Sequence, residues 1–131
     1  MKIASTASLF LVLPLLASAM PSHEFHGIRT LDLSIAAGNV KVSGVDGELS
    51  TVGVVKKRYD ERCQLVMEQR NETLFVELGP KGLYQARCEA DFEFQLPKAV
   101  SLKLKNADGD VHVSGMTDTH VFQQRKPQSR K

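Results

Sequence analysis

A seven-residue phrase occurs twice in this chain of 131 residues, and it limits the possible folds more than any other feature. Residues 38–44 read GNVKVSG and residues 109–115 read GDVHVSG. When residues 31–48 are aligned with residues 102–119, eight of the 18 positions are identical. Each unit reads as a strand, a tight glycine turn, a short strand and a second glycine turn. A unit of this size cannot bury its own apolar face, so it needs a neighbouring unit stacked on it.

Glycines bound both phrases, and we expect them to form the turns. They are Gly38, Gly44, Gly109 and Gly115. Gly38 and Gly109 are expected to adopt positive φ, because glycine alone does so without strain. An alternative is that two unrelated hairpins share a turn sequence. Matching leucines upstream of each glycine favour a true repeat over that alternative.

Polar and apolar residues alternate along most of the chain after residue 20. This period of two is typical of strands with one buried and one solvated face, and no window of 11 or more residues shows a convincing helical stripe. Val40, Val42, Val111 and Val113 are expected on one buried face, and Phe92 and Phe94 are expected to anchor the core with Phe75 or Leu74. We therefore predict an all-β fold of short repeated strands, in either a solenoid-like (β-helix) or a sandwich-like stack.

The N-terminal residues have the three parts of a secretory signal peptide. Lys2 supplies the positive charge, residues 3–16 are mostly apolar, and the small residues Ala-Ser-Ala at 17–19 predict cleavage after Ala19. The apolar run is shorter than the ~20 residues that a membrane-spanning helix needs. We predict a signal peptide at 1–19, a single β domain at 20–116 and a basic, disordered tail at 117–131, with no membrane span after cleavage.

Charge and cysteine content narrow the classes of protein further. Removal of Lys2 with the signal peptide leaves 16 basic and 15 acidic residues, a near-balance that argues against a nucleic-acid binder. Cys63 and Cys88 both lie in the exported part, where two cysteines most simply form a disulfide. That bond would close a loop of 26 residues and stabilise the fold by roughly 3 kcal/mol. A redox or metal-binding thiol pair is the alternative, but the chain has no C-x-x-C spacing and no cysteine/histidine cluster.

The repeated segments, together with the segment FEFQLPKAVSLKLKNADGDVHVSG at 92–115, resemble the bacterial putative-adhesin family, whose function is unknown. The resemblance rests on a strand that ends at Pro97 and on the pattern N-x-x-G-D-V-x-V-x-G from Asn106 to Gly115, and it covers about residues 28–116. It implies a β-helix of short strands and an adhesin-like role. Family members usually continue through several more such units, whereas this chain has one after Pro97, so the resemblance implies a short or truncated member. The strand at residues 110–114 is then expected to be an unpaired edge.

Chemically reactive clusters are scarce in this sequence. His23 and His26 lie three residues apart, but a closed zinc site needs about four ligands. The DGD at 108–110 lacks the further ligands of a calcium loop, and Asp or Asn beside glycine is a common turn. The Asn-Glu-Thr at 71–73 fits the N-glycosylation pattern, which matters only in a eukaryotic secretory pathway. We predict no catalytic residue, metal ligand or cofactor.

Three functions remain open from the sequence. The first is an exported, non-enzymatic interaction domain of the cell envelope, adhesin-like by resemblance, that a protein or cell-surface partner extends by strand addition at the exposed edge. The second is a structural or scaffolding periplasmic protein with no specific ligand. The third is a carbohydrate-active enzyme, because β-helices host such sites, although fold analogy alone is a weak argument for a function.

Overall fold

The computed structural model describes residues 22–117 and 121–125, which form ten strands and no helix. Sheet A contains β1 (Ser22–His26), β4 (Leu49–Arg58), β7 (Glu89–Pro97), β3 (Val40–Val45) and β9 (Val111–Ser114), in that order across the sheet. Sheet B contains β10 (Val121–Arg125), β8 (Ser101–Asn106), β2 (Thr30–Ile35), β6 (Thr73–Pro80) and β5 (Cys63–Arg70). The all-β prediction is confirmed. The predicted signal peptide at 1–19 lies outside the described residues.

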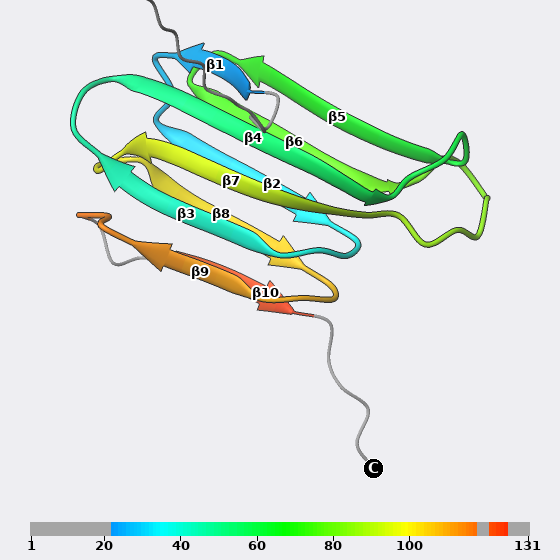
Figure 1. Cartoon of the computed structure of the whole chain (residues 1–131). Helices are drawn as coiled ribbons and strands as arrows, with labels where there is room; N and C mark the ends of the chain where they lie inside the picture. The colour runs from blue at the N-terminus through cyan, green and yellow to red at the C-terminus, as the bar shows by residue number, and fades with distance from the viewer. Residues whose placement is uncertain (1–21, 118–120, 126–131) are drawn as a thin grey trace, which may run out of the picture.

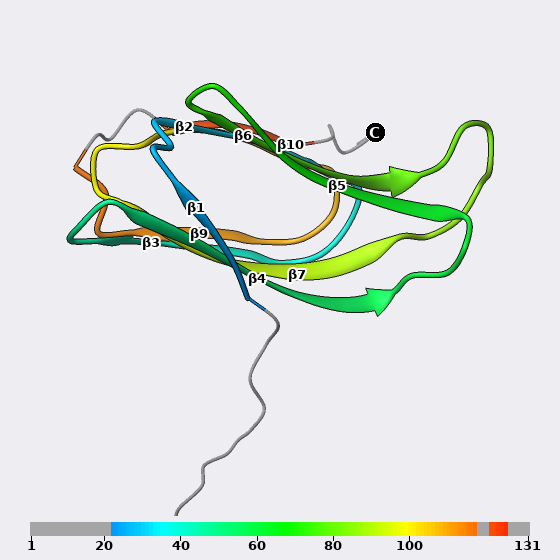
Figure 2. The same ribbon diagram turned by 90° about the horizontal axis from the view of Figure 1, so that it is seen from above.

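The two sheets face each other across one apolar core (Figures 1 and 2). Strand alternation creates this core, because every second residue of a strand points to the same face. Along β2, for example, Leu31, Leu33 and Ile35 are buried while the residues between them are half-buried. Phe92 and Phe94 lie next to each other at the centre, with ring centroids 6.0 Å apart, and Leu74 is fully buried while Phe75 is not. The expected aromatic anchor is therefore confirmed, with Leu74 as its partner in the core.

The two copies of the repeat pair with each other, in parallel and in register. On sheet B, β2 lies beside β8 with Leu31 opposite Leu102. On sheet A, β3 lies beside β9 with Val40 opposite Val111. Each copy thus crosses from sheet B to sheet A and stacks on the other copy, as the small size of the unit requires. The prediction that the units stack is confirmed.

A third layer of the same kind lies on the other side of the first copy. In this layer β6 pairs in parallel with β2, and β7 pairs in parallel with β3, so that Phe92 lies opposite Val40. The order of the layers in space is β6/β7, then β2/β3, then β8/β9. The chain passes from the first of these layers to the last without entering the middle one, so successive layers are not successive coils.

Antiparallel strands complete both sheets. The strand β4 pairs antiparallel with β7 and with β1, and β5 forms an antiparallel hairpin with β6. Both sheets are therefore mixed, and neither closes into a barrel. Of the two predicted arrangements, the described strands fit the sandwich-like one. The antiparallel strands and the order of the layers are the reasons why a regular β-helix is not seen.

The predicted turn glycines make close contacts between layers. Gly38 and Gly109 have φ of 135° and 136°, which confirms their predicted positive φ. A Cβ on Gly38 would lie 1.7 Å from the carbonyl oxygen of Ala90, and a Cβ on Gly109 would lie 1.8 Å from the carbonyl oxygen of Gly38. Gly44 has no positive φ, but its Cβ would lie 2.2 Å from the carbonyl oxygen of Gly115. Gly38, Gly44 and Gly109 need glycine because the backbones of adjacent layers touch there, and Gly115 needs it because its φ is 76°.

A disulfide joins Cys63 and Cys88 and confirms the predicted pair. Cys63 begins β5 in sheet B, and Cys88 precedes β7 in sheet A, so the bond links the two sheets at one end of the sandwich. The backbone N–H of Lys81 also donates to the carbonyl of Arg62 at this end, over 2.8 Å. This hydrogen bond and the disulfide together fix both ends of the loop that leads into β7.

The C-terminal boundary of the domain differs from the predicted one. We predicted a disordered tail from residue 117, but residues 121–125 form β10, which pairs in parallel with β8 in sheet B. The physical reason is that a parallel ladder is made by backbone groups, so β10 can extend the open side of β8 without an alternating pattern. Residues 118–120 and 126–131 of the predicted tail lie outside the described residues.

Candidate functional site

The strand β9 is one of the two outer strands of sheet A among the described residues, and it is our main candidate for a binding site. It pairs with β3 on one side, and no described strand pairs with its other side. The prediction of an exposed strand edge at residues 110–114 is therefore confirmed for the part of the chain that the structure describes.

The direction of the backbone groups of β9 follows from the ladder that it forms with β3. The N–H of Val40 donates to the carbonyl of Asp110 over 2.9 Å. In a parallel pair, alternate residues of a strand bond to a given neighbour. Since Asp110 bonds to β3, the N–H and C=O groups of Val111 and Val113 face the open side. Such groups are a template for one more strand.

Side-chain burial at β9 differs from burial at the matching positions of β3. Val40 and Val42 are 1% and 0% exposed. Val111 and Val113 point into the same sandwich and pack against the same core, yet both remain half-buried. The expected burial of all four valines is thus complete in the inner layer and partial in the outer one. The reason is that Val40 and Val42 have a neighbouring strand on both sides, whereas Val111 and Val113 have a described neighbouring strand on one side only.

A ladder of Asp and Asn side chains runs along the turns that precede these strands. The carboxylate of Asp91 accepts a hydrogen bond from the backbone N–H of Asn39 over 3.0 Å. The amide oxygen of Asn39 accepts one from the backbone N–H of Asp110 over 3.1 Å. Asp110 holds the same position in the outermost layer, and its carboxylate accepts no hydrogen bond and forms no ion pair with any residue that the structure describes. The ladder therefore ends in a free acceptor beside β9.

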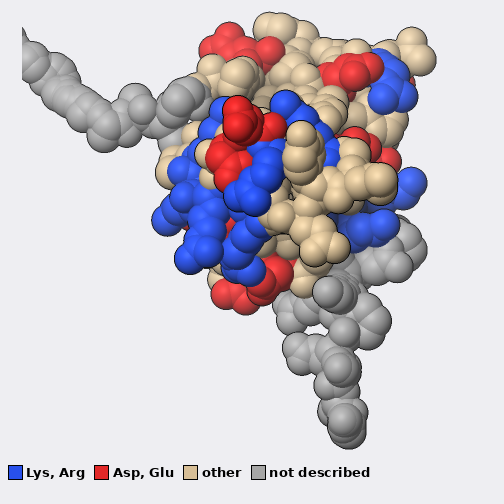
Figure 3. Space-filling model, turned by 90° about the vertical axis from the view of Figure 1, so that its right-hand side faces the viewer, with Lys and Arg blue, Asp and Glu red and all other residues tan. Residues whose placement is uncertain are grey.

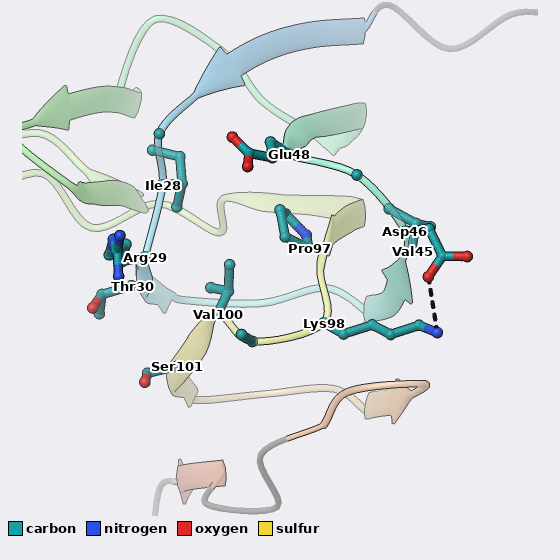
Figure 4. Close-up of a pocket in the computed structure, with 13 residues that line it drawn as sticks. Ile28, Arg29, Thr30, Val45, Asp46, Glu48, Pro97, Lys98, Val100 and Ser101 are labelled. Atoms are coloured by element: carbon teal, nitrogen blue, oxygen red, sulfur yellow. Dashed lines mark ion pairs between the residues drawn. The ribbon is translucent and has the colours of Figure 1, made fainter.

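A cleft of about 660 Å³ lies at the opposite end of the strands, between the start of β2 and the turns after β3 and β7 (Figure 4). Buried Ile28 and Val100 contribute to its lining. The Asp46 carboxylate pairs with the Lys98 ammonium group over 3.0 Å, and Glu48 points away from Asp46. Glycoside hydrolysis requires two carboxylates that flank one bond. The cleft does not present such a pair, so its geometry gives no support to the enzyme hypothesis.

Charged side chains gather at the end of the sandwich that holds the disulfide (Figure 3). Four ion pairs lie there: Lys57–Asp91, Arg62–Asp60, Arg87–Asp108 and Arg87–Glu89, at 3.5, 2.7, 3.2 and 3.4 Å. The side-chain hydrogen bond from Arg62 lowers the pKa of Asp60 and raises the pKa of Arg62. Leu83 and Tyr84 are exposed in the adjoining loop. Three of the cations at this end, Lys57, Arg62 and Arg87, are thus paired with carboxylates.

The structure places the other sequence-derived candidates apart from one another. His23 and His26 are exposed on β1, and His112 is exposed on β9. Within residues 22–117 and 121–125, no three histidine, cysteine, aspartate or glutamate side chains gather in a way that could hold a metal ion. Asn71 lies at the exposed tip of the β5–β6 turn, with φ of 56°.

Sequence reasoning missed Asp91 as a member of the ladder. Its signal was present, since Ala90, Asp91, Phe92 and Phe94 hold the positions of Gly38, Asn39, Val40 and Val42. Alanine replaces the glycine there and phenylalanine replaces the valines, so Asp91, which matches Asp110 of the second copy, is the one residue that the third unit shares with the phrase at these four positions.

Comparisons with known proteins gave a remote structural similarity. No protein-family model matches the sequence, and no curated protein matches it. A crystal structure of a "putative cell adhesion protein" from Clostridium sporogenes ATCC 15579 is similar over 72% of this chain, with a TM-score of 0.43 and 12% sequence identity. The match covers 51% of that protein, about half of its length. A similarity this low does not establish a shared fold.

None of the described segments forms a helix that is long and apolar enough to cross a membrane.

Proposed function

We propose that this protein is an exported, non-enzymatic binding domain that takes a β-strand from a protein partner onto the open edge of β9. In this mode of recognition, main-chain hydrogen bonds supply affinity and side-chain pockets supply specificity. Export is supported by the signal-peptide pattern at 1–19 and by the disulfide, since disulfides persist in oxidising compartments. The strand would add a solenoid-like layer opposite β10, which already extends sheet B.

The observation that carries the proposal is the contrast between the inner and outer valines. Val42 is 0% exposed, whereas Val113 is half-buried at the matching position of the next layer. Burying the remaining apolar surface of Val111 and Val113 would favour an added strand by roughly 25 cal/mol for each Å² removed from water. A scaffold with no ligand, the competing function, gains nothing from leaving this surface open.

Proline at position 111 provides a direct test. The N–H of Val111 faces the open side, so Val111→Pro removes a donor for an added strand and leaves the bonds to β3 in place. Proline is tolerated on edge strands in this orientation. The matched control is Met67→Pro on β5, an edge strand of the other sheet, because Met67 is also half-buried and its N–H also faces the open side of its strand.

The assay has two steps. The purified protein is used to capture partners from proteins of the bacterial cell envelope, and hydrogen exchange of the protein is then measured with and without the captured partner. We expect a bound partner to slow exchange at the amides of Val111 and Val113, and we expect Val111→Pro to abolish capture while Met67→Pro retains it. Capture that is equal in both variants would refute strand addition at β9. Absence of capture by the unchanged protein would favour the scaffold.

A further inference from the structure

The contacts between the existing layers predict the sequence of the strand that pairs with the open edge of β9. This inference rests on the proposed function, because it specifies the partner at the same site. Each layer of the sandwich constrains the next through three contacts that repeat along the stack. They are a glycine contact, a side-chain hydrogen bond and a pair of inward-facing apolar side chains.

The glycine contact sets the first position. The backbone at Gly38 lies against the carbonyl of Ala90, and the backbone at Gly109 lies against the carbonyl of Gly38, with φ values that agree within 1°. Ala90, Gly38 and Gly109 are thus stacked on one another, and a Cβ on Gly109 would lie 1.8 Å from the carbonyl oxygen of Gly38. In the same way, a residue of an added strand that stacked on Gly109 would place its Cβ against the carbonyl of Gly109. A strand that follows the same path therefore needs glycine at this position.

The side-chain ladder sets the direction of the strand. In both existing steps, an Asp or Asn side chain accepts the backbone N–H of the residue that follows the stacking position in the next layer. The carboxylate of Asp110, which accepts no hydrogen bond from a described residue, is placed to accept the corresponding N–H of an added strand. This bond lies at the start of β9, so the glycine must also lie at the start of the added strand. The added strand then runs parallel to β9, as β7 and β3 do.

The inward face sets the remaining positions. Two residues after the stacking position, each layer has an inward valine or phenylalanine, and a second one follows two residues later. These side chains cover the corresponding pair in the previous layer. Val111 and Val113 are half-buried, and two further apolar side chains at this spacing would cover them.

From these three contacts we infer that the edge of β9 recognises an extended segment of a partner protein that runs parallel to β9 and carries the pattern glycine-x-valine-x-valine. The first x supplies its backbone N–H to Asp110, and the second x points to solvent, as His112 does. A folded second copy of this chain is not the occupant. Its β3 is paired on both sides, and its β9, to run parallel with its valines inward, would have to approach with the side that already pairs with β3.

A synthetic peptide with the sequence of residues 36–45, AAGNVKVSGV, is the probe. Its binding to the purified protein is measured by fluorescence anisotropy, with a second peptide that has alanine in place of the first glycine and a third with the reversed sequence. We expect the alanine and reversed peptides to bind at least tenfold more weakly. We expect Asp110→Ala to weaken the first peptide severalfold, and Asp110→Asn to retain binding because the amide oxygen remains an acceptor.

The outcomes separate this inference from the proposed function. Equal binding of all three peptides, with slowed exchange at the amide of Val111, would overturn the glycine pattern and leave strand addition standing. Failure of every peptide to protect that amide would count against both. Peptide binding that requires deletion of residues 126–131 would overturn the inference, since it would assign the edge to the end of this chain. Dimers that form through β9 and exclude the peptide would overturn it as well.

Discussion

The contact between turn glycines can be tested with three alanine substitutions that separate backbone strain from steric contact. Gly79 has no positive φ, and a Cβ added there would have no atom within 4 Å. Gly47 has φ of 98° and open space around it. Gly38 combines φ of 135° with a Cβ position 1.7 Å from the carbonyl oxygen of Ala90. Gly79→Ala thus adds neither backbone strain nor a clash, Gly47→Ala adds backbone strain alone, and Gly38→Ala adds both backbone strain and a steric clash.

The expected magnitudes follow from these terms. Gly79→Ala is expected to be neutral or to stabilise by up to about 1 kcal/mol, because alanine has less freedom to lose in a strand. Gly47→Ala introduces a strained backbone that costs about 1–3 kcal/mol. Gly38→Ala adds a clash that forces two backbones apart and weakens the bonds from Ala90 to Ala37 (3.2 Å) and from Gly38 to Asp108 (2.9 Å). Each such bond contributes about 1 kcal/mol, so we expect a total loss of about 3–5 kcal/mol.

Urea unfolding followed by circular dichroism measures these differences as changes in the free energy of unfolding. A loss of 1 kcal/mol lowers Tm by about 4–8 °C in a domain of this size, so Gly38→Ala is expected to melt at least about 12 °C below the unchanged protein. The reasoning would be refuted if Gly38→Ala and Gly47→Ala were equally destabilised. That result would mean that the close contact between the layers adds nothing to the backbone strain.

Three further predictions concern single groups in the core and at the disulfide. Replacement of both Cys63 and Cys88 by alanine should lower the free energy of unfolding by about 3 kcal/mol under oxidising conditions. In reducing buffer, thermal melts of this variant and of the unchanged protein should be the same. A difference that persists in reducing buffer would point to packing of the two side chains and not to the disulfide. Asn106 is 2% exposed, and its side-chain amide donates a hydrogen bond to the carbonyl of Gly38 over 2.9 Å. Asn106→Leu leaves that carbonyl unpaired, so urea unfolding should show a free energy of unfolding that is lower by about 1–3 kcal/mol. An unchanged midpoint would mean that the bond is not formed. Ser50 is buried, and its hydroxyl has no hydrogen-bond partner among the described residues. In the same urea assay, Ser50→Ala should therefore be neutral or should stabilise the protein by up to about 1 kcal/mol. A clear loss of stability would show that the hydroxyl has a partner.

The repeat made much of the stack predictable from the sequence. Identical residues at Leu31 and Leu102, and at Val40 and Val111, occupy facing positions in the structure. Their identity reflects a shared environment, since each layer repeats the geometry of the one beside it. The glycine requirement was visible for the same reason, because the path of the backbone through the turn leaves no room for a Cβ.

Three features of the stack could not be predicted in this way. The layer of β6 and β7 was hidden because Phe92 and Phe94 fill, with larger side chains, the positions that valines fill elsewhere. The strand β10 was missed because its pairing with β8 depends on backbone groups, which all sequences share. The hydrogen bonds that connect the ladder were also invisible, since they join Asn39 to residues 52 and 71 positions away.

The four outer strands of the two sheets differ in the charged residues of their sequences, and this difference singles out β9. Natural sheets protect their edges with charged side chains, among other devices. The sequence of β1 contains Glu24, that of β5 contains Glu68 and Arg70, and that of β10 contains Arg125, whereas β9 contains valine, histidine and serine alone. The charge nearest to β9 in the sequence is on Asp110, immediately before the strand, where the ladder of Asp91 and Asn39 ends. This edge carries two half-buried valines, has no Asp, Glu, Lys or Arg within the strand, and begins with a carboxylate that accepts no hydrogen bond from a described residue. The combination supports our proposal that β9 admits one strand in one direction and is not an edge merely left over at the end of a sheet.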